Sequence, residues 1–277
     1  MKYIVILCDG MADEPLEELD GRTPLEAART VNMDRLAADS EIGMVRTVPE
    51  GMAPGSDTAN LSVIGYDPRK YYSGRSPLEA LSIGAEMGEN DVSFRCNLVT
   101  LSEEEDRYED RVILDHSSGE IPTEEAAALV EALREGLGRE GYTFYVGTSY
   151  RHLLIQKDGK VTDLTPPHDI LTKRIGEYLP EDPVLREMMV RSYEILKDHP
   201  VNVKRRAEGK NPANSVWFWG EGTKPRLTPF ETLYGKKGAV ISAVDLVKGI
   251  GILAGLKVIE VEGATGNWDT NFAGKAN

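Results

Sequence analysis

The sequence has little of what disulfide-stabilised, zinc-thiolate or membrane-spanning proteins require. It contains two cysteines, Cys8 and Cys96, which form no Cys-x-x-Cys pair, so neither a disulfide framework nor a thiolate zinc site is predicted. No apolar run approaches the roughly 20 residues that cross a bilayer, and the apolar start meets Asp9 too early for a signal peptide. We therefore expect a cytoplasmic protein without a membrane partner, in which both cysteines are buried as small hydrophobic residues.

Positive charge is also scarce. The 277 residues contain 32 Lys and Arg against 46 Asp and Glu, a formal net charge of −14 at pH 7. Non-specific binding to nucleic acid requires a basic surface. We therefore do not expect nucleic acid to be a partner of this acidic protein. Apolar residues at 40% and charged residues at 28% are typical of a globular protein, and the length allows one large domain or two ordinary ones.

The order of the predicted elements indicates an α/β core with an insertion. Residues 3–8 read as a strand buried on both faces of a parallel sheet, and a strand-helix-strand order returns over residues 238–261. Other strands are predicted at residues 43–48, 92–101, 111–115, 142–146 and 153–156, and helices opening at Thr23, Asn32 and Ser56 and over residues 123–140 and 183–196. We therefore predict a parallel-sheet core made of residues 1–89 and 236–277, with an inserted α+β domain of residues 90–235.

Two residues stand where α/β proteins bind ligands. Asp9 follows the predicted first strand at its carboxyl end, although an Asp-Gly turn explains the same residue. Ser56 follows Pro54 and Gly55 at a predicted helix N-terminus, where free N–H groups favour an anion, as a serine that attacks phosphate requires. The alternative is that Ser56 only caps the helix. No histidine is close in sequence to Ser56, so a metal ion held by Asp9 and Ser56 is one way to activate the hydroxyl.

The sequence lacks the common motifs of nucleotide-binding proteins and serine hydrolases. Gly249 and Gly251 fall seven or more residues after a predicted strand, inside a helical pattern, and not at the strand-to-helix turn that a pyrophosphate loop needs. The sequence contains neither a Walker loop nor a Gly-x-Ser-x-Gly elbow. No nucleotide cofactor is therefore expected.

Eight ordered motifs resemble one known family. They lie at residues 6–13, 54–68, 74–80, 94–100, 150–152, 166–169, 217–220 and 263–266. On these residues the sequence resembles the cofactor-independent, that is 2,3-bisphosphoglycerate-independent, phosphoglycerate mutases of the archaeal type, which belong to the alkaline phosphatase superfamily. The resemblance implies an α/β fold with an alkaline-phosphatase-like parallel sheet core, incomplete at the C-terminus of this chain, and an inserted α+β domain.

The resemblance also implies a reaction. Ser56 would be the nucleophile that becomes a phosphoserine, and Asp9 and Ser56 would be metal ligands. The enzyme would interconvert 3-phosphoglycerate and 2-phosphoglycerate in glycolysis and gluconeogenesis, using two divalent ions of manganese, magnesium or zinc and no 2,3-bisphosphoglycerate. The enzyme would bind this small phosphorylated acid as its substrate.

Cationic side chains are the candidates for holding that substrate. They are Arg75, Arg95, Arg151, His116, His168 and, more weakly, Lys248. An arginine can bind two phosphate or carboxylate oxygens at once. The alternative for each arginine is an ordinary surface salt bridge, and the alternative for each histidine is a loop residue without a role in binding.

One departure from the family affects the expected activity. Members of the family continue beyond the position that matches Asn277, and the portion that follows carries the remaining Asp and His metal ligands. The resemblance therefore predicts that this polypeptide is inactive or severely impaired, with an exposed sheet edge that a second copy could cover in a homo-oligomer. Two alternatives stay open, a homoserine kinase or phosphatase of the same superfamily and a non-catalytic remnant that binds phosphorylated acids.

Overall fold

The structure is a computed structural model, and it describes residues 1–266 and 269–277. Residue contacts divide the chain into two units, Met1–Arg46 and Thr47–Asn277. Among the described residues, no helix is long and apolar enough to span a membrane. The domain boundaries predicted at residues 89/90 and 235/236 stay predictions.

The first unit contains short helices. They are η1 (Glu17–Leu19), α1 (Pro24–Ala27) and α2 (Val31–Ala38). Helix α1 begins as predicted, because the Thr23 hydroxyl accepts the Glu26 N–H at 3.2 Å while the Glu26 carboxylate accepts the Thr23 N–H at 2.8 Å. This reciprocal arrangement satisfies two N–H groups that the helix leaves without partners.

The strands predicted at residues 3–8 and 43–48 are wrong. The structure describes all of these residues and places none of them in a strand, and Ile4 and Ile6 are 83% and 81% exposed. A strand needs a neighbour for its N–H and C=O groups, and pairing between described residues of this unit is limited to the isolated bridge between Leu16 and Arg22. Cys8 is consequently exposed, against the prediction, whereas Cys96 is buried as predicted.

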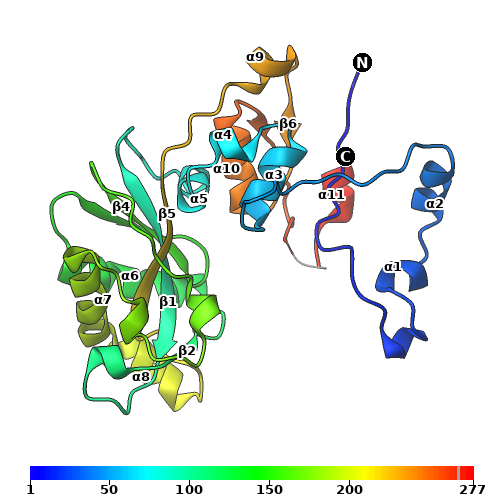
Figure 1. The fold of residues 1–277 in the computed structure, drawn as a ribbon. Helices are drawn as coiled ribbons and strands as arrows, with labels where there is room; N and C mark the ends of the chain where they lie inside the picture. The colour runs from blue at the N-terminus through cyan, green and yellow to red at the C-terminus, as the bar shows by residue number, and fades with distance from the viewer. Residues whose placement is uncertain (267–268) are drawn as a thin grey trace. The chain divides into compact units, whose positions relative to one another are not determined.

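An antiparallel sheet organises the second unit (Figure 1). Its strands are β1 (Val92–Leu101), β2 (Ile113–Asp115), β3 (Tyr142–Tyr145), β4 (Arg151–Gln156) and β5 (Ser215–Thr223). Strand β1 pairs with β4 and with β5 along most of its length and with β2 at its end. Every residue of β1 is buried, so the strand forms the centre of the core.

Helices cover this sheet. Helices α6 (Thr123–Leu137) and α7 (Pro183–Leu196) pack on each other, α6 also on β3 and α7 on β5, and α8 (Pro200–Ala207) contacts α6 (Figure 1). Helix α7 has the predicted bounds, because the Asp182 carboxylate accepts the N–H groups of Val184 and Leu185 and fixes its start. Short 3₁₀ turns complete this part at η2 (Tyr108–Asp110), η3 (Pro167–Ile170) and η4 (Gly176–Tyr178).

A second cluster of elements adjoins the sheet through α5. It contains α3 (Ser56–Val63), α4 (Pro68–Tyr71), α5 (Ser76–Ser82), α9 (Phe230–Tyr234), α10 (Asp245–Leu253), β6 (Ala239–Val240) and β7 (Lys257–Val258), with α11 (Phe272–Ala276) following. Strands β6 and β7 pair in parallel with α10 between them in sequence, as the strand-helix-strand pattern predicts, although both strands are shorter than predicted. The mixed α/β class is therefore confirmed, with one antiparallel and one parallel sheet.

The glycine pair at residues 249 and 251 serves helix packing. Both residues lie inside α10, as predicted, and a Cβ at Gly249 would overlap the carbonyl oxygen of Leu78 in α5. A side chain there would force the two helices apart. Gly249 therefore allows α10 and α5 to approach closely, whereas a Cβ at Gly251 would overlap the Val240 side chain of β6, and neither glycine lies in a strand-to-helix loop.

Candidate functional site

Arg95 lies on the buried central strand. Its neighbours in the sheet are Leu153 of β4 and Trp219 of β5, and its side chain is 6% exposed. The guanidinium carbon lies 4.4 Å from the centroid of the Trp219 ring, which is a cation–π contact. Arg95 Nε lies 3.0 Å from a carboxylate oxygen of Glu79, but its N–H makes no hydrogen bond to any described residue. Burial lowers the pKa of Arg95, and the Glu79 charge opposes this effect.

Glu79 of α5 joins Arg95 to Arg75. One Glu79 oxygen contacts Arg95, and the other accepts a hydrogen bond from Arg75 Nε at 3.1 Å. The two preceding residues hold Arg75 in place, because the Ser73 hydroxyl donates to the Thr223 carbonyl at 2.7 Å and a Cβ at Gly74 would overlap the carbonyl oxygen of Glu221. Gly74 also has φ of +124°, which glycine adopts without strain. Arg75 is therefore presented beside β5 by a fixed backbone.

The two candidate histidines lie beside Trp219 and beside each other. The ring centroid of His168, in η3, lies 5.1 Å from that of Trp219 and 6.1 Å from that of His116. His116 follows β2, and its ring lies 5.8 Å from that of Tyr150. Burial lowers the pKa of His168, and the positive charges of Arg95 and Arg75 act in the same direction, while Asp169 opposes them. The imidazole of His168 is accordingly neutral near pH 7.

Arg151 begins β4 and is exposed. Its guanidinium carbon lies 4.9 Å from the centroid of the Tyr150 ring, and its charge lowers the pKa of Arg95. In the sheet Arg151 pairs with Asn97, two residues along β1 from Arg95. The structure thus brings five predicted residues into one cationic cluster, which we call the arginine–histidine cluster: Arg75, Arg95, Arg151, His116 and His168.

His152, next to Arg151, gives a prediction about pH. Its side chain is buried, Nδ1 accepts the Gly147 N–H at 3.1 Å, and burial lowers its pKa from 6.5 to about 4. Between these values the unfolded chain binds a proton that the folded protein does not, so lowering the pH through this window reduces the free energy of unfolding by up to about 3 kcal/mol. We expect His152→Gln, which keeps an acceptor, to lose this part of the pH dependence.

Urea unfolding of both proteins at several pH values from about 7 to about 4 measures the difference. Carboxylates contribute equally to the pH dependence of unfolding in both proteins, so their contribution cancels in the difference. Parallel stability curves for the two proteins across the window would contradict the prediction.

Ser56 is the first residue of α3. Gly55 occupies the N-cap position, and the Ser56 hydroxyl makes no hydrogen bond to the described residues, so it does not serve as a cap. The neighbouring Asp57 carboxylate accepts a hydrogen bond from the Tyr72 hydroxyl at 2.9 Å. Burial raises the pKa of Tyr72, followed by the effect of Asp57, so the hydroxyl keeps its proton. This bond connects the start of α3 to the segment that carries Arg75.

Lys248 and Asp9 have other surroundings within their own units. Lys248, on α10, pairs with Glu260 at 2.9 Å and contacts no member of the arginine–histidine cluster in the described residues. Asp9 belongs to the first unit, where the Met11 N–H donates to the Cys8 carbonyl across a turn, as the Asp-Gly alternative describes. The proposed roles of both residues stay predictions.

The described residues do not provide a metal site. Residues 1–266 and 269–277 contain no group of three or more His, Cys, Asp or Glu side chains placed to hold one ion. A zinc ion takes four ligands, and magnesium or manganese takes six. Within either unit, the described side chains therefore do not fit the two predicted ions.

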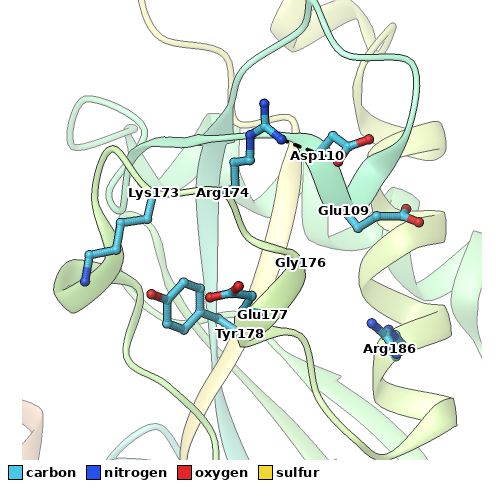
Figure 2. A pocket seen from close by; sticks show the side chains of 8 residues that line it. All are labelled: Glu109, Asp110, Lys173, Arg174, Gly176, Glu177, Tyr178 and Arg186. Carbon is cyan, nitrogen blue, oxygen red and sulfur yellow. Dashed lines mark ion pairs between the residues drawn. The ribbon is translucent and has the colours of Figure 1, made fainter.

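A separate hollow lies beside η2, η4 and α7. It measures about 610 Å³ and is lined by Glu109, Asp110, Lys173, Arg174, Gly176, Glu177, Tyr178 and Arg186 (Figure 2). None of the predicted site residues lines it. Opposite charges are mixed along its walls, which distinguishes it from the cationic cluster.

Sequence reasoning missed Glu79, Asn97 and Trp219 as parts of the site. Residues 94–100 and 217–220 stand among the motifs quoted for the resemblance, but those motifs assigned no role to Asn97 or Trp219. The strand β5 itself was not predicted, although the run Val216, Trp217, Phe218 and Trp219 is rich in the β-branched and aromatic residues that strands favour. That signal would have placed Trp219 opposite Arg95.

The fold and the cluster define a mixed α/β protein that carries arginine and histidine side chains together on its antiparallel sheet. A family model described as 2,3-bisphosphoglycerate-independent phosphoglycerate mutase matches residues 37–202. The chain is 54% identical to the protein of that name from Methanosarcina barkeri, over all of this chain and 69% of the relative. It is 53% identical to a probable one from Geobacter sulfurreducens, over 99% of this chain and 69% of the relative.

Solved structures agree with these relatives. A protein from Pyrococcus horikoshii superposes with a TM-score of 0.74 at 33% identity, over 97% of this chain and 64% of that one. The cofactor-independent phosphoglycerate mutase from Thermoplasma acidophilum gives a TM-score of 0.51 at 28% identity, over 92% and 68% of the two chains. The chain belongs to the 2,3-bisphosphoglycerate-independent phosphoglycerate mutase family, and the predicted resemblance is confirmed. It spans about two thirds of the length of these relatives.

Proposed function

We propose that the arginine–histidine cluster binds a phosphoglycerate and that the protein's reaction is the interconversion of 3-phosphoglycerate and 2-phosphoglycerate. The observation that carries this proposal is Arg95, a nearly buried guanidinium that forms an ion pair with Glu79 and no hydrogen bond to any described residue. Buried donors in proteins are almost always paired, because an unpaired buried charge is costly. An oxyanion from outside the chain supplies the missing acceptors.

The three arginines suit a molecule with two anionic groups. Glu79 neutralises one positive charge of the Arg75 and Arg95 pair, so the pair and Arg151 together keep an excess of two. A phosphoglycerate carries a phosphate and a carboxylate, and each can accept two parallel N–H bonds from one guanidinium. The neutral imidazole of His168, beside Trp219, can accept a hydrogen bond from the hydroxyl of the same molecule.

Ser56 is the proposed acceptor of the phosphate. Its exposed hydroxyl stands at the start of α3, an eight-residue helix whose free N–H groups favour the charge of a phosphate. The Ser56 oxygen forms a bond to phosphorus and gives up its proton, while the bond between phosphorus and the C3 oxygen breaks and the C3 oxygen takes up a proton. The C2 hydroxyl of glycerate then takes the phosphate from Ser56 by the reverse steps.

We keep two divalent ions in the proposed mutase reaction, although the described residues of either unit do not complete a site for them. For the same reason we propose that the 277-residue polypeptide binds phosphoglycerate without turning it over, as the remnant alternative holds.

A coupled assay with 2-phosphoglycerate, with and without manganese, tests this function. We expect no conversion by the 277-residue polypeptide, and manganese-dependent conversion by the product of the full native reading frame that falls at least about 1,000-fold in Ser56→Ala. Release of free phosphate in place of 3-phosphoglycerate would identify a phosphatase instead. Unchanged activity of Ser56→Ala would remove Ser56 from the reaction.

A further inference from the structure

A buried amide holds the arginine–histidine cluster together. Asn97 of β1 is 1% exposed, and both ends of its side chain are used. Its Oδ1 accepts the indole N–H of Trp219 at 2.9 Å, and its Nδ2 donates to the backbone carbonyl of His116 at 3.1 Å. One amide thus joins the central strand, β5 and the loop that follows β2.

The two groups that Asn97 bonds carry the cluster. The Trp219 ring supports Arg95 on its face and contacts the His168 ring, so a rotation of the indole would move both. The His116 loop is already tied internally, because the Asp115 carboxylate accepts the N–H groups of Ser117 and Gly119. The bond from Asn97 connects this preformed loop to the sheet.

The amide is the group that this position requires. A carboxylate of the same shape would accept from the indole but would place an oxygen against the His116 carbonyl, and an apolar side chain would bond neither group. Leaving buried donors and acceptors without partners favours a rearrangement of the groups around them. The arrangement of His116, His168 and Arg95 therefore depends on one side chain that itself points at no ligand.

We propose that Asn97 is a positioning residue, which sets the geometry of His116 and Trp219 and through them the affinity of the arginine–histidine cluster for a phosphoglycerate. This inference rests on the proposed function. It predicts that Asn97→Leu, which keeps the shape of the side chain and removes both bonds, impairs binding more than it impairs folding.

Asn214 supplies a matched control. It is also fully buried beside β1, where its amide bonds the N–H of Leu101 at 2.8 Å and the carbonyl of Leu101 at 2.9 Å. It contacts no member of the arginine–histidine cluster among the described residues. The Asn214 amide also donates to the Glu103 carboxylate at 3.2 Å, so Asn214→Leu removes an equally buried amide with at least as many hydrogen bonds at the end of the same strand.

Calorimetric titration with 3-phosphoglycerate compares the two variants of the full chain. We expect the dissociation constant to rise at least about tenfold in Asn97→Leu and to stay within about twofold in Asn214→Leu, while urea unfolding shows both proteins destabilised. If Asn97→Leu does not fold, Trp219→Phe is the second variant, because it keeps a smaller aromatic ring under Arg95 and removes the indole N–H that Asn97 accepts. The inference is overturned if folded Asn97→Leu, or Trp219→Phe in its place, binds 3-phosphoglycerate as tightly as Asn214→Leu does.

Proton and nitrogen NMR of the same proteins separates this inference from the proposed function. The imidazole signals of His116 and His168 are expected to shift in Asn97→Leu and Trp219→Phe and to stay unchanged in Asn214→Leu, with or without 3-phosphoglycerate. If the unsubstituted protein binds no 3-phosphoglycerate, the proposed function fails and the inference about affinity fails with it. If it binds and the histidine signals do not move in either variant, the positioning role alone is wrong.

Discussion

Arg95→Met is expected to weaken the binding of 3-phosphoglycerate by at least about 100-fold, because it removes two charge-assisted hydrogen bonds worth about 1.5–3 kcal/mol each. The variant is expected to fold. Methionine can still cover the face of Trp219, and removing a buried charge that has no hydrogen bond leaves Glu79 paired with Arg75. Titration calorimetry gives the affinity, and thermal unfolding gives the stability of the same sample.

Arg111 provides the control for this substitution. It is a second buried arginine whose guanidinium lies over an aromatic ring, 3.9 Å from the centroid of Tyr193, but its Nη1 donates to the Ser102 carbonyl at 2.7 Å. Arg111→Met is therefore expected to lower stability and to leave the affinity within about twofold. Comparable losses of affinity in both variants would mean that Arg95 acts through the fold and binds no anion.

Trp217→Ala is expected to reduce the free energy of unfolding by about 3–5 kcal/mol, the largest loss from any single truncation that the core suggests. Trp217 of β5 is 1% exposed and lies opposite Asn97 of β1. Its indole N–H donates to the Thr165 carbonyl at 2.8 Å, which ties the loop before His168 to the sheet. Alanine leaves both a cavity and an unpaired carbonyl.

Trp217→Phe separates these two contributions. Phenylalanine fills most of the space and removes the bond to Thr165, so we expect a loss of about 1–2 kcal/mol. Urea unfolding followed by circular dichroism measures both variants. A loss below about 1 kcal/mol in Trp217→Ala would show that the β1–β5 core is less tightly packed than the structure describes.

Local sequence signals predicted α7 and β1 of the second unit well and the strand at residues 3–8 of the first unit wrongly. Helix α7 and strand β1 have the predicted bounds, because capping by Asp182 and the frequent β-branched and apolar residues of 92–101 are local properties of the chain. Residues 3–8 form a continuous apolar run, richer in apolar residues than β1, but form no strand. A strand is stabilised by a neighbour that sequence composition does not supply, so the same signal succeeded in one place and failed in the other.

The candidate site divides in a similar way. The resemblance supplied its charged members, Arg75, Arg95, Arg151, His116 and His168, and their gathering could not be read from spacing. The groups that arrange them come from pairing across the sheet, where Asn97 and Trp219 meet although they are 122 residues apart in sequence. Glu79 was missed because an acid on a short helix is usually solvated, and only the packing of α5 on β1 brings it to Arg95.

A crystal structure of the protein with 3-phosphoglycerate tests the central claim most directly. The account predicts phosphate or carboxylate oxygens within about 2.7–3.2 Å of the Arg95 guanidinium, with Arg75 or Arg151 on the other anionic group. Electron density for the ligand in the hollow of Figure 2, or at another place that leaves Arg95 without a new partner, would contradict it.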